Sequence, residues 1–133
     1  MTAGRVETWV PPQGPNVELV AAGRWWDAVR APSFVGVRVL ARLGGDSGAV
    51  IEDGFGATFY WLVRPGAADA WELPGSYVAV QGTATYVAVP PVTRTEGPGL
   101  RWAVPLGRTR CLTDPALLHA TLAAELDAMI GPR

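Results

Sequence analysis

The pattern of hydrophobic and polar positions predicts two helices, the clearer of which lies near the C-terminus. There Asp114 is placed to cap the helix, Pro115 fits its first turn, and Gly131 ends it. One face of this helix is an apolar stripe made of Leu118, Leu122, Leu126 and Met129. A second helix is predicted over residues 34–43, with Ser33 as its N-cap and Gly44-Gly45 as its end.

Short runs rich in β-branched and aromatic residues predict the strands. The 49–63 run is a hairpin whose tight turn is Asp53-Gly54, and residues 65–75 form a loop with one helical turn around 67–71. The segments 76–80 and 86–89 are expected to pair around Gly82. The remaining strands are expected at 16–20, 24–30 and 100–104.

This order of elements predicts an α+β fold. We expect a single small domain, with a mostly antiparallel sheet of about five to six strands and two helices. Residues 1–15 contain three prolines and two glycines, and we interpret them as a loose N-terminal arm that Trp9 ties to the body. The domain itself is expected to span residues 16–133.

Composition narrows the possible functions. Of the 133 residues, 49% are hydrophobic and 17% are charged, and the charged share is below the roughly 25% of average soluble domains. The net charge of −1 argues against general nucleic-acid affinity, which needs a clustered positive field. No apolar run approaches the roughly 18 residues of a membrane span, and no signal peptide is recognisable. We therefore expect a cytoplasmic protein that does not enter a membrane.

Few residues offer catalytic or metal-binding chemistry. The chain has one histidine, His119, which excludes a multi-histidine metal site. It has one cysteine, Cys111, which excludes an internal disulfide. His119 lies on the flank of the helical stripe, where a partly buried structural histidine is the usual outcome, and Cys111 has no general base near it in sequence. The sequence therefore predicts neither a catalytic triad nor a cofactor.

The acidic residues also favour structural positions. Asp27 lies inside the predicted 24–30 strand, and a packing or turn role is expected for it. Two-metal chemistry needs several acids that converge on ions about 3.5–4 Å apart, generally from rigid strands. The other candidates are expected to be solvated, at the hairpin tip and in the loop: Glu52, Asp53, Asp69 and Glu72.

The six tryptophans mainly predict a small core covered by rings. Trp61 and Trp102 are expected inside, and Trp71 in a loop. Trp25 and Trp26 are adjacent, so on a strand they face opposite sides and one of them can be exposed. Exposed rings beside arginines would stack bases or bind a protein partner. The arginines concerned are Arg24, Arg94 and Arg101.

One stretch resembles a known family. The run Tyr86-Val-Ala-Val-Pro-Pro-Val-Thr-Arg94, followed by Glu96-Gly97 and Leu100-Arg-Trp102, is similar to the closing motif of the bifunctional DNA primase/polymerase domain. That domain belongs to the archaeo-eukaryotic primase superfamily. The resemblance covers about residues 23–128, and only its Pro-Pro block is reasonably specific.

The departures from the family bear on function. Active members carry an Asp-x-Asp metal pair on one strand and a phosphate-contacting histidine on another. Here Asp27 stands in the first place without a second acid, and residues 56–61 contain no histidine. Without the acid pair, phosphoryl transfer loses its main electrostatic support. The resemblance therefore implies a degenerate relative that is not an enzyme.

The resulting hypothesis is a primase/polymerase-like domain that acts as a small binding or regulatory protein. A protein partner or a second copy is the first expectation. A nucleotide or single-stranded nucleic acid is the second, and a residual nucleotidyltransferase that uses Asp27 is the third. No catalytic, metal or cofactor residue is predicted. The predicted binding residues form a surface of tryptophan, arginine, tyrosine and proline side chains: Trp26, Tyr86, Pro90, Pro91, Arg94 and Arg101.

Overall fold

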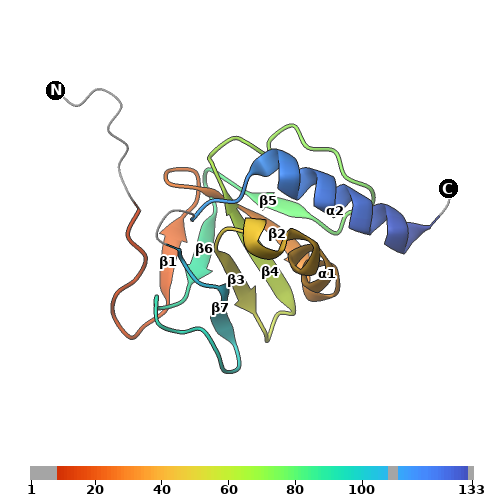
Figure 1. Cartoon of the computed structure of the whole chain (residues 1–133). Helices are drawn as coiled ribbons and strands as arrows, with labels where there is room; N and C mark the ends of the chain where they lie inside the picture. The colour runs from red at the N-terminus through yellow and green to blue at the C-terminus, as the bar shows by residue number, and fades with distance from the viewer. Residues whose placement is uncertain (1–8, 108–110, 132–133) are drawn as a thin grey trace.

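The computed structural model describes residues 9–107 and 111–131, and it confirms the α+β class. Within these residues, seven strands and two α-helices form a single small domain, and Figure 1 shows both helices against the sheet. The strands are β1 (Glu18–Ala21), β2 (Asp27–Pro32), β3 (Val50–Asp53), β4 (Thr58–Val63), β5 (Ala79–Gln81), β6 (Tyr86–Val89) and β7 (Leu100–Val104). The helices are α1 (Ser33–Leu43) and α2 (Pro115–Ile130), and a short 3₁₀ turn, η1 (Gly44–Asp46), follows α1.

The strands divide into two antiparallel sheets. The larger has the order β5-β2-β4-β3-β7, and the smaller is the β1–β6 pair, which we call the ribbon. Alternate residues of one strand face opposite sides of a sheet. On β4, Trp61 therefore packs under the helices, whereas Leu62 packs toward the ribbon. The molecule thus has three layers: the helices, the larger sheet and the ribbon.

The hairpin of β3 and β4 is confirmed, but its connection is longer than predicted. Residues 54–57 lie between the strands, so Asp53-Gly54 is not a two-residue turn. The carboxylate of Asp53 accepts hydrogen bonds from the backbone N–H groups of Phe55 and Gly56, at 3.1 and 3.0 Å. This side-chain cap stabilises a four-residue connection, and Ala57 takes a φ of 53° to close it.

The predicted pairing of 76–80 with 86–89 is wrong. β5 pairs with β2 in the larger sheet, and β6 pairs with β1 in the ribbon. A turn closed by the hydrogen bond from Thr85 N–H to Gly82 O lies between them, at 3.0 Å. β6 pairs with β1 because Val87 and Val89 then become buried between the two sheets, which local alternation does not reveal.

The C-terminal helix follows its predicted signals closely. The Asp114 carboxylate accepts a hydrogen bond from Leu117 N–H at 2.9 Å, and Pro115 occupies the first turn. Three members of the stripe are completely buried, Leu118, Leu122 and Leu126. Met129, the fourth member of the stripe, is 40% exposed, so the apolar stripe extends beyond the buried core.

Helix α1 begins without a side-chain cap. Ser33 is its first helical residue, and the capping position belongs to Pro32, so the prediction of Ser33 as N-cap is wrong. Gly36 is buried against the sheet, where an added Cβ would lie only 2.6 Å from Cγ of Phe59. This close approach lets the helix axis lie near β4. No helix of the described residues is both long and apolar enough to cross a membrane.

Candidate functional site

Three of the six predicted binding residues are buried: Trp26, Pro90 and Pro91. Pro90 and Pro91 are buried, and the carbonyl of Pro90 accepts a hydrogen bond from the indole N–H of Trp102 at 3.2 Å. Trp26 is only 1% exposed, and the ring of Trp9 meets it edge-on at 5.4 Å. The side chains of Trp26, Pro90 and Pro91 therefore cannot contribute to a binding surface, although sequence reasoning placed them there.

The arginines of the predicted surface lie in different environments. Arg94 is exposed, and its guanidinium lies 3.5 Å from the carbonyl of Pro15. Arg101 forms an ion pair with Glu52, at 2.6 Å between Nη2 and Oε1, and also donates to the carbonyl of Thr95. A phosphate would have to compete with Glu52 for this guanidinium. Only Arg94 and the exposed Tyr86 remain freely accessible from the predicted set.

The predicted strand position of the tryptophan pair is wrong, because Trp25 and Trp26 precede β2, which begins at Asp27. Trp26 points into the core between the larger sheet and the ribbon, whereas Trp25 is half-buried. The guanidinium of Arg24 lies 4.7 Å from the centre of the Trp25 ring, a cation–π contact that occupies one face of that ring. Arg24 and Trp25 therefore form the aromatic–arginine contact that the sequence suggested.

Asp27 is a buried carboxyl group rather than a cleft residue. It is 2% exposed, and its Oδ2 accepts a hydrogen bond from the backbone N–H of Gly66 at 2.8 Å. Oδ1 is buried without a hydrogen-bond partner, and the backbone of Gly82 lies against the same carboxyl group. Among the described residues, no group of three or more acidic, histidine or cysteine side chains could hold a metal ion.

Cys111 and His119 have structural surroundings. Burial raises the pKa of the Cys111 thiol to about 11, so the thiol is protonated and a poor nucleophile at neutral pH. The His119 ring on α2 lies 5.0 Å from the ring of Trp71 and is half-buried. These two side chains lie on different segments, and no hydrogen bond links them among the described residues. They do not form a nucleophile–base pair.

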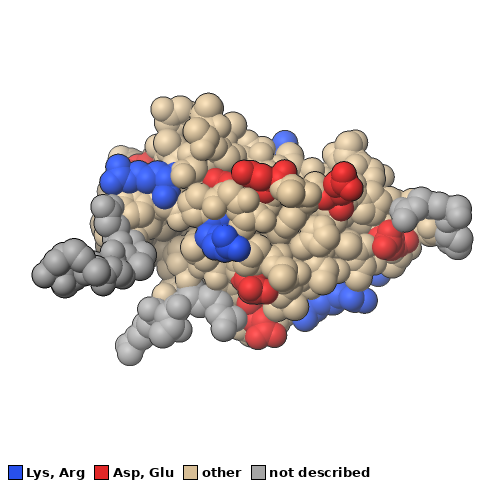
Figure 2. Space-filling view, turned by 90° about the horizontal axis from the view of Figure 1, so that it is seen from above, with Lys and Arg blue, Asp and Glu red and all other residues tan. Residues whose placement is uncertain are grey.

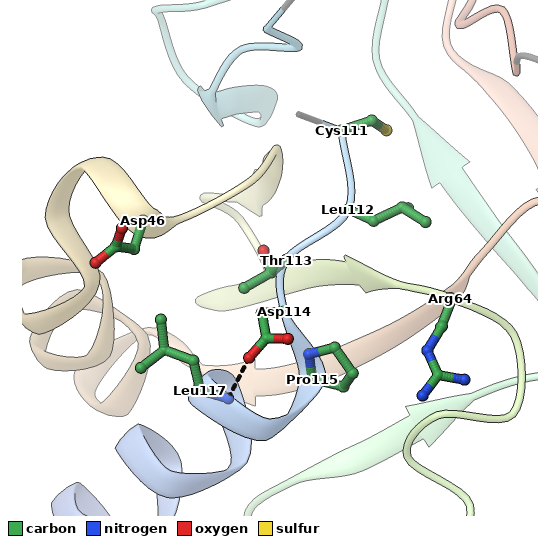
Figure 3. A pocket seen from close by; sticks show the side chains of 8 residues that line it. All are labelled: Asp46, Arg64, Cys111, Leu112, Thr113, Asp114, Pro115 and Leu117. Carbon is green, nitrogen blue, oxygen red and sulfur yellow. Dashed lines mark hydrogen bonds between the residues drawn. The ribbon is translucent and has the colours of Figure 1, made fainter. Parts of the chain in front are cut away.

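A cavity of about 670 Å³ lies at the N-terminal end of α2 (Figure 3). Asp114, Pro115 and Leu117 of the helix line it, together with Asp46, Arg64, Cys111, Leu112 and Thr113. Arg64 and Asp46 project from opposite sides of the helix end. The capping carboxylate of Asp114 occupies the position an anion would take, and Thr113 already accepts a hydrogen bond from Gly48 N–H at 3.0 Å. The cavity lacks a nucleophile or base activated for catalysis among its described residues.

The ribbon carries an exposed apolar row on its outer face. Residues 19 and 21 of β1 stand on the same face as Tyr86 and Ala88 of β6, because Leu19 pairs with Ala88 and Ala21 pairs with Tyr86. Leu19 is 72% exposed and Tyr86 67% exposed. Inward residues of the same strands, Val87 among them, pack against the larger sheet. Sequence reasoning identified Tyr86 but missed Leu19, whose signal is the alternation within residues 17–21.

Charge does not mark a nucleic-acid surface on the face seen in Figure 2. There the acidic side chains lie along the middle, and the basic ones are separated from one another by uncharged surface. No family model matches the chain, and no curated protein or solved structure matches it either. The ribbon is therefore the candidate functional surface because of its geometry and chemistry alone.

Proposed function

We propose that this protein is a non-catalytic association domain in which two copies pair through the ribbon. One observation carries the proposal: the outward row of the ribbon has no charged side chain, and its two large residues, Leu19 and Tyr86, are 72% and 67% exposed. Exposed apolar patches on small domains commonly mark sites of association. A descent from a primase/polymerase-like ancestor remains part of the proposal and rests on the Tyr86–Trp102 stretch.

The backbone of β1 supports pairing at its edge. Ala22 N–H donates to Thr85 O at 2.9 Å, so these two residues are a hydrogen-bonded pair of the ribbon ladder. Such pairs alternate along an antiparallel ladder, so the N–H and C=O groups of Leu19 and Ala21 point away from β6. Within the described residues, no strand pairs with this edge of β1. Open edges of this kind readily accept a further strand.

A second copy fits this edge for reasons of symmetry and charge. When β1 of one copy lies antiparallel to β1 of a second copy across a two-fold axis, the N–H groups of each strand face the C=O groups of the other. The edge of β1 is therefore complementary to itself. The outward row, at residues 19, 21, 86 and 88, contains no charged side chain that would repel a copy. Two four-residue strands are small compared with a standard interface of about 800 Å² per partner, so we expect a reversible dimer with a Kd of about micromolar order.

The acidic residues support the lack of catalysis in this proposal. One oxygen of the Asp27 carboxylate accepts a hydrogen bond from Gly66 N–H, and Glu52 forms an ion pair with Arg101. The Asp53 carboxylate accepts hydrogen bonds from two N–H groups of its turn. Each of these carboxylates therefore already stabilises the fold. Metal-assisted phosphoryl transfer would need such groups to be free and convergent.

Light scattering and sedimentation over a wide concentration range test the proposal. We expect a concentration-dependent dimer for the native protein, and monomers for Leu19→Lys and Tyr86→Lys, because lysine on an edge or outward face opposes pairing. Phe55→Lys is the matched control, since Phe55 is an apolar side chain 84% exposed on the β3–β4 connection. Circular dichroism should show unchanged folding in all three variants. A native monomer at the highest concentrations, or dimers in every variant, would contradict the proposal.

A further inference from the structure

A second apolar surface lies on the opposite face of the larger sheet, between α1 and α2. A cavity of about 340 Å³ opens there, lined by Phe34, Val35, Arg38, Glu125, Ala128 and Met129. We call it the helix groove. Figure 1 shows the two helices on the same side of the larger sheet. The groove therefore does not overlap the ribbon.

The rim of the helix groove is apolar at one end. Phe34 is 57% exposed and Met129 is 40% exposed. The ring of Tyr77 meets Phe34 edge-on at 6.0 Å and extends the apolar surface beyond the cavity. Exposed aromatic and methionine side chains beside a cavity are typical anchors of protein interfaces.

The other end of the groove carries an excess of positive charge. The Glu125 side chain is only 10% exposed, and its two oxygens are shared between Arg38 Nε at 3.1 Å and Arg42 Nε at 2.5 Å. Two guanidinium groups therefore share one carboxylate. Their side chains remain 72% and 56% exposed, so both are accessible to a further anionic group.

We propose that the helix groove binds an amphipathic helix of a protein partner, which places an apolar side chain in the cavity and an acidic side chain against Arg38 and Arg42. The volume suits one large apolar side chain with part of its neighbours, at the lower end of ordinary binding cavities. Phe34 on the apolar rim and Arg38 are four residues apart on α1, one helical turn, so the partner's acid is expected about one turn from its apolar anchor. A basic partner would meet uncompensated positive charge and is disfavoured.

Peptide display tests this inference directly. A library of randomised helical peptides of about four turns is selected on the native protein, and the enriched peptides are then measured by fluorescence anisotropy. We expect enriched peptides to share apolar residues at helical spacing with Asp or Glu one turn away. Binding should weaken at least about tenfold in Met129→Glu, which puts a charge at the mouth of the cavity.

A charge exchange identifies the role of the arginines. Replacing Arg38 and Arg42 by Glu should abolish binding of the acidic peptides, and the same peptides with Lys in place of the acid should bind this variant. Val37→Glu is the matched control, because Val37 is 57% exposed on α1 but does not line the cavity. Leu19→Lys should leave peptide binding intact, which separates this inference from pairing through the ribbon.

Several results would overturn the inference. They are a selection that yields no peptide sensitive to Met129→Glu, enriched peptides without acidic residues, and peptides bound equally well after reversal of the two arginines. A dimer of this protein that depends on Met129 and excludes the peptides would also overturn it, because the occupant would then be a second copy.

Discussion

Replacement of Asp27 separates a structural role from a catalytic one. The carboxyl group is 2% exposed, holds Gly66 N–H with one oxygen, and has no hydrogen-bond partner for the other. If Asp27 only ties the segment after β4 to the start of β2, a neutral acceptor of the same shape should replace it. If it serves to bind a cation, the charge itself should be needed. Asp27→Asn and Asp27→Ala distinguish these cases.

The expected magnitudes follow from the contacts of the carboxyl group. Asn keeps a carbonyl oxygen for Gly66 and removes the desolvation cost of a buried acid, so Asp27→Asn should change the free energy of unfolding by less than about 1 kcal/mol. Asp27→Ala leaves the Gly66 N–H without its acceptor and should cost about 2 kcal/mol. In a domain of this size, that corresponds to a fall in Tm of about 8 °C.

Urea denaturation followed by circular dichroism, and calorimetry with and without Mg²⁺ or Mn²⁺, measure these differences. We expect the native protein to be the most stable, Asp27→Asn to be close to it, and Asp27→Ala to be the least stable. Neither cation should change the Tm of any of the three. Equal losses in Asn and Ala would refute the reasoning, because the negative charge would then matter and not the acceptor. A cation-dependent rise in Tm for the native protein that disappears in Asp27→Asn would point to a metal site.

Three further predictions concern other parts of the fold. Because burial raises the pKa of the Cys111 thiol to about 11, the folded state should lose stability as pH rises from 9 toward 11, and Cys111→Ala should remove that part of the slope in urea midpoints against pH. Gly36→Ala should destabilise the protein by about 1–2 kcal/mol in urea denaturation, since the clash with Phe59 outweighs a helix-propensity gain of about 1 kcal/mol; a stabilised variant would show that α1 can shift. The native protein and the double variant Arg94→Ala/Arg101→Ala should give the same anisotropy of labelled single-stranded DNA at low salt. A salt-dependent rise in anisotropy with the native protein that the double variant lacks would instead favour nucleic-acid binding.

The elements that sequence predicted best are those specified by neighbouring residues. Helix α2 has its cap, its proline and its stripe within the same segment, and the β3–β4 hairpin is formed by adjacent strands. The partners of β5 and β6 depend on contacts between distant segments. Val87 and Val89 are compatible with either pairing when only local alternation is considered, and burial against the larger sheet decides between them.

The binding residues were harder to predict because residue type does not determine which side of a strand is covered. Trp26 and Pro90 are the kinds of residues that anchor interfaces, yet here they fill the space between the larger sheet and the ribbon. Leu19 is an ordinary core residue by type and is among the most exposed large hydrophobic side chains of the described residues. Its exposure follows from topology, because no other element of the described residues packs on the outer face of the ribbon.

The three-layer arrangement places the two proposed contacts on separate faces of one small domain. Each outer layer buries one face against the larger sheet and leaves its other face to solvent. The ribbon's outer face carries Leu19 and Tyr86, and the helix layer opens a groove beside Met129. Since the larger sheet lies between them, a copy paired at the ribbon need not block a helix in the groove. A dimer would then present two such grooves, and multivalent binding could strengthen an individually weak helix contact.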